Sequence, residues 1–187
     1  MKISALVLAG GKATRMGGVD KGLALFDGRT MIDRAVDVVS GCSDDVIISC
    51  NRNRDVYQKL AGKVVADQMG GYLGPLAGVH AALAVAESEH LLVIPCDTPL
   101  LSVEEINLLI VSAKANPDAI IALSDGEFVH PLHAIIPVGL ALSLTQYLRS
   151  GKRSVQGWYQ QHETCHVQLT TEQSKRLINV NNTQQLV

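Results

Sequence analysis

The chain is organised around residues 8–21, Leu8-Ala9-Gly10-Gly11-Lys12-Ala13-Thr14-Arg15-Met16-Gly17-Gly18-Val19-Asp20-Lys21, which directly follow an apolar run at residues 3–8. An apolar run followed by several glycines predicts a strand that ends in a glycine-rich loop. Glycine permits positive φ values and close approach, so successive backbone N–H groups can converge on an anion. Arg15 and Lys21 add positive charge to the same stretch. The stretch therefore predicts a phosphate-binding loop, with a nucleotide as the expected ligand.

The spacing of this loop differs from the two commonest phosphate-binding signatures. A P-loop requires Ser or Thr after its Gly-Lys pair, whereas Lys21 is followed by Gly22, and the G-x-G-x-x-G fingerprint is absent. These differences argue against P-loop ATPases and NAD enzymes. A glycine-rich turn that merely joins a strand to a helix is the alternative. The two cations make phosphate binding the better interpretation.

The pattern Leu-Ala-Gly-Gly, Arg-Met-Gly, Asp-Lys resembles the signature of nucleotidyltransferases, and most closely that of the molybdenum cofactor guanylyltransferases. Later stretches resemble motifs of the same family, so the likeness spans nearly the full chain. They are Tyr72-Leu73-Gly74-Pro75-Leu76-Ala77-Gly78, Cys96-Asp97-Thr98-Pro99 and Asn179-Val180-Asn181. The family usually continues with Thr-Pro-Glu-Glu, where this chain has Asn182-Thr183-Gln184-Gln185. The last helix is therefore expected to start differently.

The composition predicts one soluble domain over residues 1–187. Hydrophobic residues make up 47% of the chain and aromatic residues only 4%, which is typical of an aliphatic core. The formal net charge of -2, without a run of Lys and Arg, gives no footprint for nucleic acid or an anionic membrane. No apolar stretch suits a signal peptide or a membrane span, so we expect a cytoplasmic protein. The four cysteines lack C-x-x-C spacing, which favours free thiols.

Strand-like and helix-like segments alternate along the chain, which predicts an α/β fold. Thr30 can begin one helix, Pro75 can occupy the first position of another that runs to about residue 85, and Ser102 with Glu105 forms a capping box ahead of a third. We expect a Rossmann-like, mostly parallel or mixed sheet with helices on both faces, and the resemblance implies the nucleotidyltransferase fold. A fourth helix is expected over residues 137–149, and residues 152–171 are weakly patterned. The predicted strands after the first are residues 46–50, 64–66, 91–95, 119–123 and 129–136.

Polar residues follow three of the predicted strands at the point where each strand ends. They are Asn51, Asp67 and Asp97. Because ligands of open parallel sheets bind beyond the carboxyl ends of the strands, we expect these side chains to lie at one edge with the glycine-rich loop. Each taken alone suits an ordinary turn or cap. Asp97 lies between two prolines, and one carboxylate beside a triphosphate is an adequate protein contribution to Mg²⁺.

The family resemblance implies a role for each matching position. Lys21, Arg15 and Asp97 are expected to be catalytic, with Asp97 as the Mg²⁺ ligand. GTP is expected to contact Leu8, Ala9, Gly10, Gly11, Lys21, Asn51, Asp67 and Asp97. The molybdopterin side is expected to include Gly78, His130, Arg153, Asn179 and Asn181.

One competing motif, His162-Glu163-Thr164-Cys165-His166, matches the H-E-x-x-H pattern of zinc proteases. That pattern requires a helix, and the β-favouring residues at 164, 165 and 167 predict a strand instead. We interpret the match as coincidence. His130 and His133 are expected to point to opposite faces of a strand, and so not to form a metal pair.

The resemblance implies transfer of GMP from MgGTP to the phosphate of molybdopterin, with release of pyrophosphate and formation of the molybdopterin guanine dinucleotide cofactor. A cofactor-insertion or adaptor protein is a candidate partner. Two alternatives stay open. One is a cytidylyltransferase or sugar-phosphate nucleotidylyltransferase on the same fold, and the other is a nucleotide-binding module without turnover.

Overall fold

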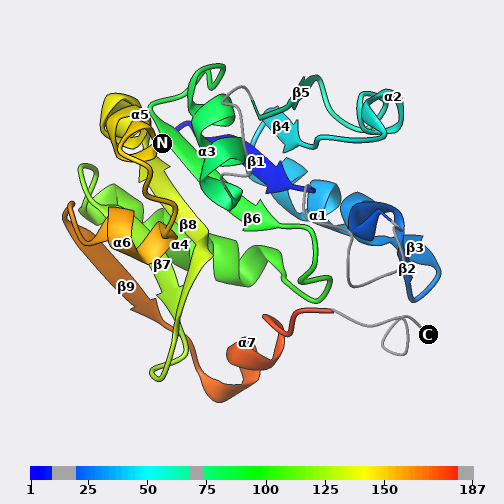
Figure 1. Ribbon diagram of the computed structural model, residues 1–187. Coiled ribbons are helices and arrows are strands. Elements are labelled where there is room, and N and C mark those ends of the chain that lie inside the picture. Colours follow the sequence, from blue (N-terminus) through cyan, green and yellow to red (C-terminus); the bar gives the residue numbers. More distant parts are fainter. Residues whose placement is uncertain (10–19, 68–73, 181–187) are drawn as a thin grey trace.

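The computed structural model describes residues 1–9, 20–67 and 74–180, and a seven-stranded sheet runs through its centre (Figure 1). The strand order is β5-β4-β1-β6-β8-β7-β9. Only β8 runs antiparallel to its neighbours, so the predicted mostly parallel, mixed sheet is confirmed. The strands are β1 (Ser4–Leu8), β4 (Asp45–Ser49), β5 (Lys63–Val65), β6 (His90–Pro95), β7 (Ile120–Ser124), β8 (Val129–Pro137) and β9 (Thr164–Gln168). A small hairpin pairs β2 (Leu25–Phe26) with β3 (Arg29–Thr30).

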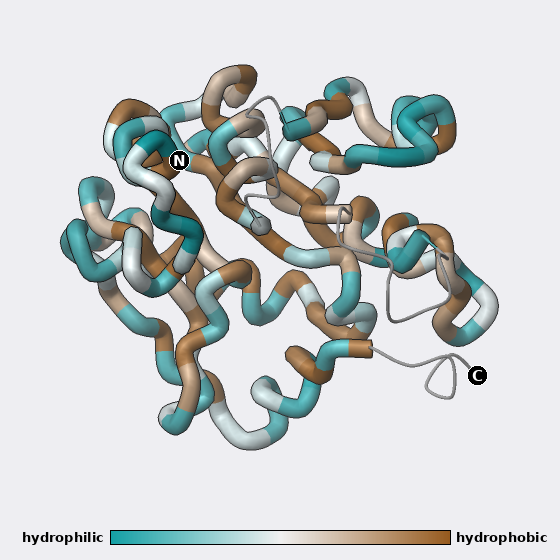
Figure 2. Tube along the Cα trace, in the orientation of Figure 1, coloured by the Kyte–Doolittle hydropathy of each residue, from teal (hydrophilic) through white to brown (hydrophobic). Residues whose placement is uncertain are grey.

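Helices cover both faces of the sheet, and the alternation of side chains along β1 decides which face each helix covers. Ala5 and Val7 pack in one core with α1 (Met31–Ser40), α2 (Arg54–Tyr57) and α4 (Val103–Ala115). Leu6 and Leu8 pack in a second core with α3 (Pro75–Leu83), α5 (Ala141–Arg149) and α6 (Val155–Tyr159). A strand buried on both faces is uniformly apolar. Figure 2 accordingly shows hydrophobic residues concentrated along the central strands.

The helix starts expected from the sequence are confirmed. Thr30 accepts a hydrogen bond from the Asp33 backbone at the start of α1, and Pro75 opens α3. Ser102 and Glu105 form the predicted capping box of α4. The short helix α7 (Thr171–Lys175) carries a second box, built on Thr170. In the described part of the chain, no helix is long and apolar enough to span a bilayer.

The helix predicted over residues 137–149 begins later in the structure, where α5 starts at Ala141. β8 continues through Pro137, because it pairs with β6 as far as His90 and the next backbone N–H, of Val138, donates to the Glu89 carbonyl at 2.8 Å. A 3-10 turn, η3 (Val138–Leu140), then leads into α5. The weakly patterned residues 152–171 contain α6 and β9. The long-range pairing with β7 stabilises β9.

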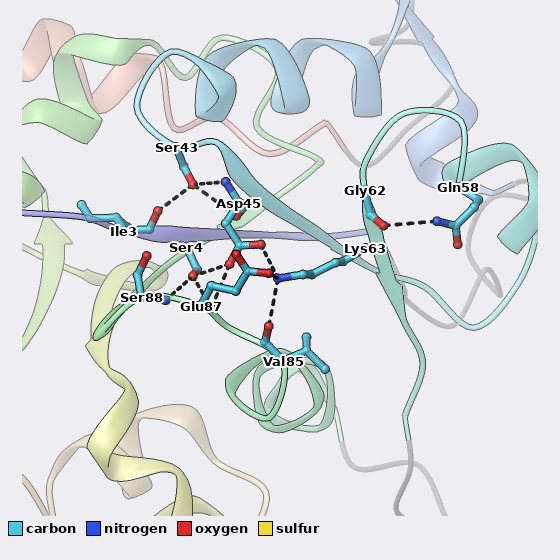
Figure 3. A network of polar contacts seen from close by, with 10 residues as sticks. All are labelled: Ile3, Ser4, Ser43, Asp45, Gln58, Gly62, Lys63, Val85, Glu87 and Ser88. Atoms are coloured by element: carbon cyan, nitrogen blue, oxygen red, sulfur yellow. Dashed lines mark hydrogen bonds and ion pairs between the residues drawn. The ribbon is translucent and has the colours of Figure 1, made fainter.

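A polar cluster joins the amino ends of three strands (Figure 3). Ser4, at the start of β1, donates to Asp45 Oδ2 at 2.6 Å and accepts from the backbone of Glu87 at 3.0 Å. Lys63, at the start of β5, donates to Asp45 Oδ1 at 2.6 Å and to Glu87 Oε1 at 2.7 Å. Burial alone would raise the pKa of Asp45, but the hydrogen bonds from Lys63, Ser4 and the Glu87 backbone lower it below its usual value. The cluster therefore ties the strands to the turn after α3.

Replacing Asp45 by Asn should lower the free energy of unfolding at pH 7 by about 2 kcal/mol, because hydrogen bonds to a charged group are lost. A carboxyl group with a lowered folded-state pKa stabilises the native protein above its unfolded pKa, and this contribution is lost as the pH falls through the folded pKa. The difference between wild type and Asp45→Asn should therefore shrink below about pH 4. Urea unfolding at pH 7 and pH 3 measures both values.

The matched control is Asp37→Asn. Asp37 also pairs with a cation at 2.6 Å, Arg29, but its side chain is 60% exposed. Solvent screens an exposed pair, so its loss should change the free energy of unfolding much less than the loss of Asp45. Equal effects of the two substitutions would contradict a structural role for the cluster around Asp45.

Candidate active site

The parallel strands bring the polar residues that follow them to one edge of the sheet. β5, β4, β1 and β6 are neighbours and parallel, so their carboxyl ends lie side by side. Asp67 follows β5, Asn51 follows β4 and Asp97 follows β6. Three strand spacings, about 14 Å, separate β5 from β6. The predicted convergence of these residues on one edge is confirmed, and the edge is long enough for an extended ligand.

Lys21 and Asp97 form an ion pair at this edge. Lys21 is the first residue of η2 (Lys21–Leu23), and its Nζ lies 2.6 Å from Asp97 Oδ2. The same ammonium donates to Asn179 Oδ1 at 2.9 Å. The backbone N–H of Val180 donates to the Asp97 carbonyl at 2.8 Å. Figure 1 shows how the segment after α7 runs back toward the loop after β6, so the early, middle and late parts of the chain meet around Lys21 and Asp97.

The second carboxylate oxygen of Asp97 is the distinctive atom of the site. Among the described residues, Asp97 Oδ1 is buried without a hydrogen-bond partner. An unpartnered buried acceptor is costly, and few occur in native proteins. A hard cation prefers carboxylate oxygen, so this atom fits a Mg²⁺ ion. The Asp97 side chain as a whole is 18% exposed, so the residue borders solvent although Oδ1 itself is buried.

Neighbouring elements hold the turn that carries Asp97. The Cys96 backbone donates to the Leu8 carbonyl at 3.1 Å, which continues the pairing of β6 with β1. Thr98 Oγ1 lies 3.0 Å from Nε2 of the buried His133 on β8. Burial, with a smaller contribution from the charge of His130, lowers the pKa of His133 to about 3. A neutral imidazole therefore supports this turn at neutral pH.

The expectation that His130 and His133 point to opposite faces is wrong. The pairing of β8 with β7 shifts between Ala122 and Leu123, so residues 131–133 fall out of register. This irregularity brings the two imidazoles to 6.0 Å in an edge-on arrangement. The two rings have different partners: His130 Nε2 lies 2.9 Å from Asp125 Oδ2, whereas His133 contacts Thr98.

Asn51 and Asp67 form a second pair at the edge. Asn51 Nδ2 donates to Asp67 Oδ2 at 2.9 Å, and the Asp67 backbone donates to Asn51 Oδ1 at 3.1 Å. Asn51 is exposed and Asp67 is half-buried. The two loops after β4 and β5 are thus joined by side chains that a ligand can reach.

Gly78 has a packing role that the sequence did not reveal. A Cβ atom there would lie 2.5 Å from Ser49 Oγ and 2.8 Å from Leu8 Cδ2. Glycine therefore lets α3 approach β4 and the end of β1, where the buried Leu8 and Ala9 lead into the loop. The Ala9 backbone donates to the Ser49 carbonyl at 2.9 Å.

The remaining predicted residues fall into two groups. Arg153 donates to the Leu148 carbonyl at 3.0 Å and so caps the end of α5. Within the described ranges, no hydrogen bond or ion pair joins Arg153 to Lys21, Asp97 or Asn179. Four predicted residues lie outside the described residues: Gly10, Gly11, Arg15 and Asn181.

Asp20 is a residue of the site to which the sequence analysis gave no role. Its carboxylate accepts hydrogen bonds from Tyr57 Oη at 2.6 Å and from Asn53 Nδ2 at 2.8 Å. The Asp-Lys order of the quoted stretch was the available signal. Tyr57 carried no such signal, because only the fold brings α2 against η2.

The H-E-x-x-H match lies on a turn and a strand. His166 lies within β9 and is exposed, whereas His162 precedes the strand and contacts Ser143 Oγ at 2.8 Å. The predicted strand is confirmed. Of the residues placed by the structure, no group of three or more His, Cys, Asp or Glu side chains could hold a metal ion.

Comparison with known proteins finds relatives both in sequence and in structure. A molybdenum cofactor guanylyltransferase from Shewanella baltica is 36% identical over 184 residues, which cover 98% of this chain and 93% of that protein. Molybdopterin-guanine dinucleotide biosynthesis protein A from Archaeoglobus fulgidus is similar in structure, with a TM-score of 0.79, 21% identity and coverage of 100% and 95% of the two chains. A 2-C-methyl-D-erythritol 4-phosphate cytidylyltransferase from Thermus thermophilus gives 0.74 at 15% identity, with coverage of 100% and 96%. These two likenesses indicate the α/β nucleotidyltransferase fold.

The family itself follows from a match over most of the chain. Residues 5–165 match the model of the MobA-like NTP transferase domain. The chain belongs to the MobA-like NTP transferase family and is a nucleotidyltransferase of the molybdenum cofactor guanylyltransferase type.

Proposed function

We propose that this enzyme transfers GMP from GTP to the phosphate of molybdopterin, releasing pyrophosphate and forming the molybdopterin guanine dinucleotide cofactor. The observation that carries the proposal is the cluster of Lys21, Asp97 and Asn179, with its unpartnered carboxylate oxygen, at the carboxyl edge of the sheet. The name of the Shewanella relative supports the choice of guanine nucleotide and of acceptor. In this proposal residues 1–187 form one domain, because both cores share a single sheet.

The nucleotide would extend along the edge from β6 toward β5. Its phosphates would lie near Lys21 and the backbone of Leu8, Ala9, Gly10 and Gly11. The N–H donors would come from the glycines, because the Ala9 N–H already donates to the Ser49 carbonyl. Its nucleoside would reach the Asn51 and Asp67 pair, whose amide and carboxylate are suited to hydrogen bonds with a base or ribose. Arg15 would add a second cation at the phosphates.

The proposed transfer forms a bond from a phosphate oxygen of the acceptor to the α-phosphorus and breaks the bond to the pyrophosphate oxygen. Lys21 would stabilise the charge that develops on the leaving pyrophosphate. The acceptor phosphate is already anionic, so no side chain has to remove a proton. Asp97 would hold Mg²⁺, which when bound neutralises phosphate charge and keeps the phosphates in position.

The acceptor side is proposed from the family resemblance. His130 and Arg153 are retained as candidate contacts, together with Asn181. Asn179 touches Lys21, which favours a role at the phosphates between the two substrates. Gly78 would act through the packing of α3 rather than by direct contact.

A cofactor-insertion or adaptor protein stays a candidate partner. The cytosol is the proposed location, since Cys42, Cys50, Cys96 and Cys165 are free thiols and disulfides are rare in that compartment.

Nucleotide preference separates the proposal from a cytidylyltransferase on the same fold. GTP with Mg²⁺ should raise the melting temperature more than CTP, ATP or UTP, because a ligand that binds only the native state stabilises it by about 2.7 kcal/mol at a hundredfold excess over its Kd. Each nucleotide is also measured with EDTA in place of Mg²⁺. A larger shift with CTP would overturn the choice of guanine.

Asp97→Asn should reduce single-turnover transfer at least about a hundredfold, because the change removes a charge at the phosphates but keeps the shape of the side chain. GTP should still bind, with a weaker dependence on Mg²⁺, since the backbone of the loop and Lys21 are unchanged. GTP affinity and transfer are measured at several Mg²⁺ concentrations after the melting temperature is checked.

Ser43→Ala is the control for this change. Ser43 is buried and donates to the Ile3 carbonyl at 2.6 Å, at the opposite end of the sheet. Its replacement should leave transfer unaltered. Wild-type rates and an unchanged Mg²⁺ dependence in Asp97→Asn would contradict the proposal that Asp97 holds Mg²⁺, and would leave it with only a structural role in its turn.

A further inference from the structure

The Asp20 carboxylate, one residue before Lys21, is held by donors from two separate parts of the chain. Tyr57 Oη donates to Oδ1 at 2.6 Å and Asn53 Nδ2 donates to Oδ2 at 2.8 Å. The Gly22 backbone N–H also donates to Oδ1, at 3.1 Å. Asp20 is the N-cap of η2, the turn that begins with Lys21. The contacts therefore fix the backbone on both sides of Lys21.

Tyr57 is buried completely and approaches η2 unusually closely. A Cβ atom on Gly22 would lie 2.5 Å from Tyr57 Oη, so the hydroxyl occupies the space that any other residue at 22 would need. Burial, and then the hydrogen bond to Asp20, raise the pKa of Tyr57 far above its usual value. The hydroxyl stays protonated and remains a donor to the carboxylate.

Asn53 is held in an unusual conformation that serves the same contact. Its φ is 49°, in the left-handed region, and it is the N-cap of α2. An N-cap Asn normally turns its side chain to the first N–H groups of the helix. Here the side chain makes no such bond and instead donates to Asp20.

We propose that Asp20, Tyr57 and Asn53 form a positioning unit that fixes the ammonium of Lys21 against the nucleotide phosphates, at a set distance from the nucleoside-binding loop. The loop that carries Asn51 continues directly into Asn53 and α2, so the same unit sets the separation between Lys21 and Asn51. This inference rests on the proposed function, because it acts through the role of Lys21 in transfer.

Tyr57→Phe tests the unit, since it removes one hydroxyl and keeps the ring that fills the core. Single-turnover transfer should fall between about tenfold and a hundredfold, because a small displacement of a charged group at a reacting phosphate is costly. The Kd for GTP should change less than about threefold, since the contribution is made mainly in the transition state. Ser43→Ala, which also removes one buried hydroxyl, is the control and should keep wild-type transfer.

A double-mutant cycle distinguishes positioning from general loosening of the fold. If Tyr57 acts through Lys21, then Tyr57→Phe in the Lys21→Ala background should change the remaining transfer less than about twofold. Glycine at position 53 tolerates the positive φ but lacks the side-chain amide. With Lys21 unchanged, Asn53→Gly should therefore reduce transfer as much as Tyr57→Phe does. Amide exchange gives an independent measurement, because the Gly22 and Leu23 N–H groups, which donate to Asp20, should lose protection in Tyr57→Phe while β6 keeps it.

Three outcomes would overturn the inference. The first is wild-type transfer in Tyr57→Phe, and the second is an equal loss in both backgrounds. The third is unchanged exchange at the Gly22 and Leu23 amides. If Lys21→Ala alone keeps wild-type transfer, it is the role of Lys21 in the proposed function that fails, and the exchange data still report whether Tyr57 holds this segment.

Discussion

The ion pair between Lys21 and Asp97 is the interaction on which the rest of the site depends. It joins the segments that follow β1 and β6, two adjacent parallel strands whose carboxyl ends must lie side by side. Because Asn179 bonds to the same ammonium and Val180 to the Asp97 backbone, the last described residues are held at this point as well. Asp97 thus connects distant parts of the chain through Oδ2 and its backbone carbonyl, while Oδ1 has no partner in the described residues.

Asp45 and Asp97, at opposite edges of the sheet, differ in how fully their carboxylates are paired. At the amino edge, Asp45 accepts from Ser4, Lys63 and the Glu87 backbone, so both of its oxygens have partners. At the carboxyl edge, Asp97 leaves one oxygen unpaired. Saturated clusters stabilise a fold, whereas an unsatisfied buried acceptor in a native structure requires a separate explanation. Among the described residues, His90 Nδ1 at the amino end of β6 is also buried without a partner, so it is an unpaired oxygen together with a carboxylate charge that marks Asp97 as the place for a cationic ligand.

The fold could be predicted from the sequence where local signals agree with the tertiary structure. The apolar runs became strands, and Thr30, Pro75 and Ser102 began helices where their chemistry requires. Prediction failed where a distant partner decides: β8 continues through Pro137 because β6 pairs with it, and a register shift brings His130 beside His133. Of the site, Lys21 and Asp97 were found from residue type and position. Tyr57 was not, because only the packing of α2 against η2 reveals it.

The antiparallel direction of β8 explains how residues from the second half of the chain reach the carboxyl edge. A parallel strand at this position would begin at the amino edge and could approach the ligand only with its end. Because β8 runs opposite to β6, its start lies beside the end of β6, so His133 can support Thr98 and the hairpin that carries His130 lies at the same edge. In the proposed function, the four parallel strands would provide the nucleotide-binding edge, and the reversed strand would extend it toward the second substrate. Selectivity for that substrate would then depend on the β7–β8 hairpin, where His130 contacts Asp125 and not the pair of Lys21 and Asp97.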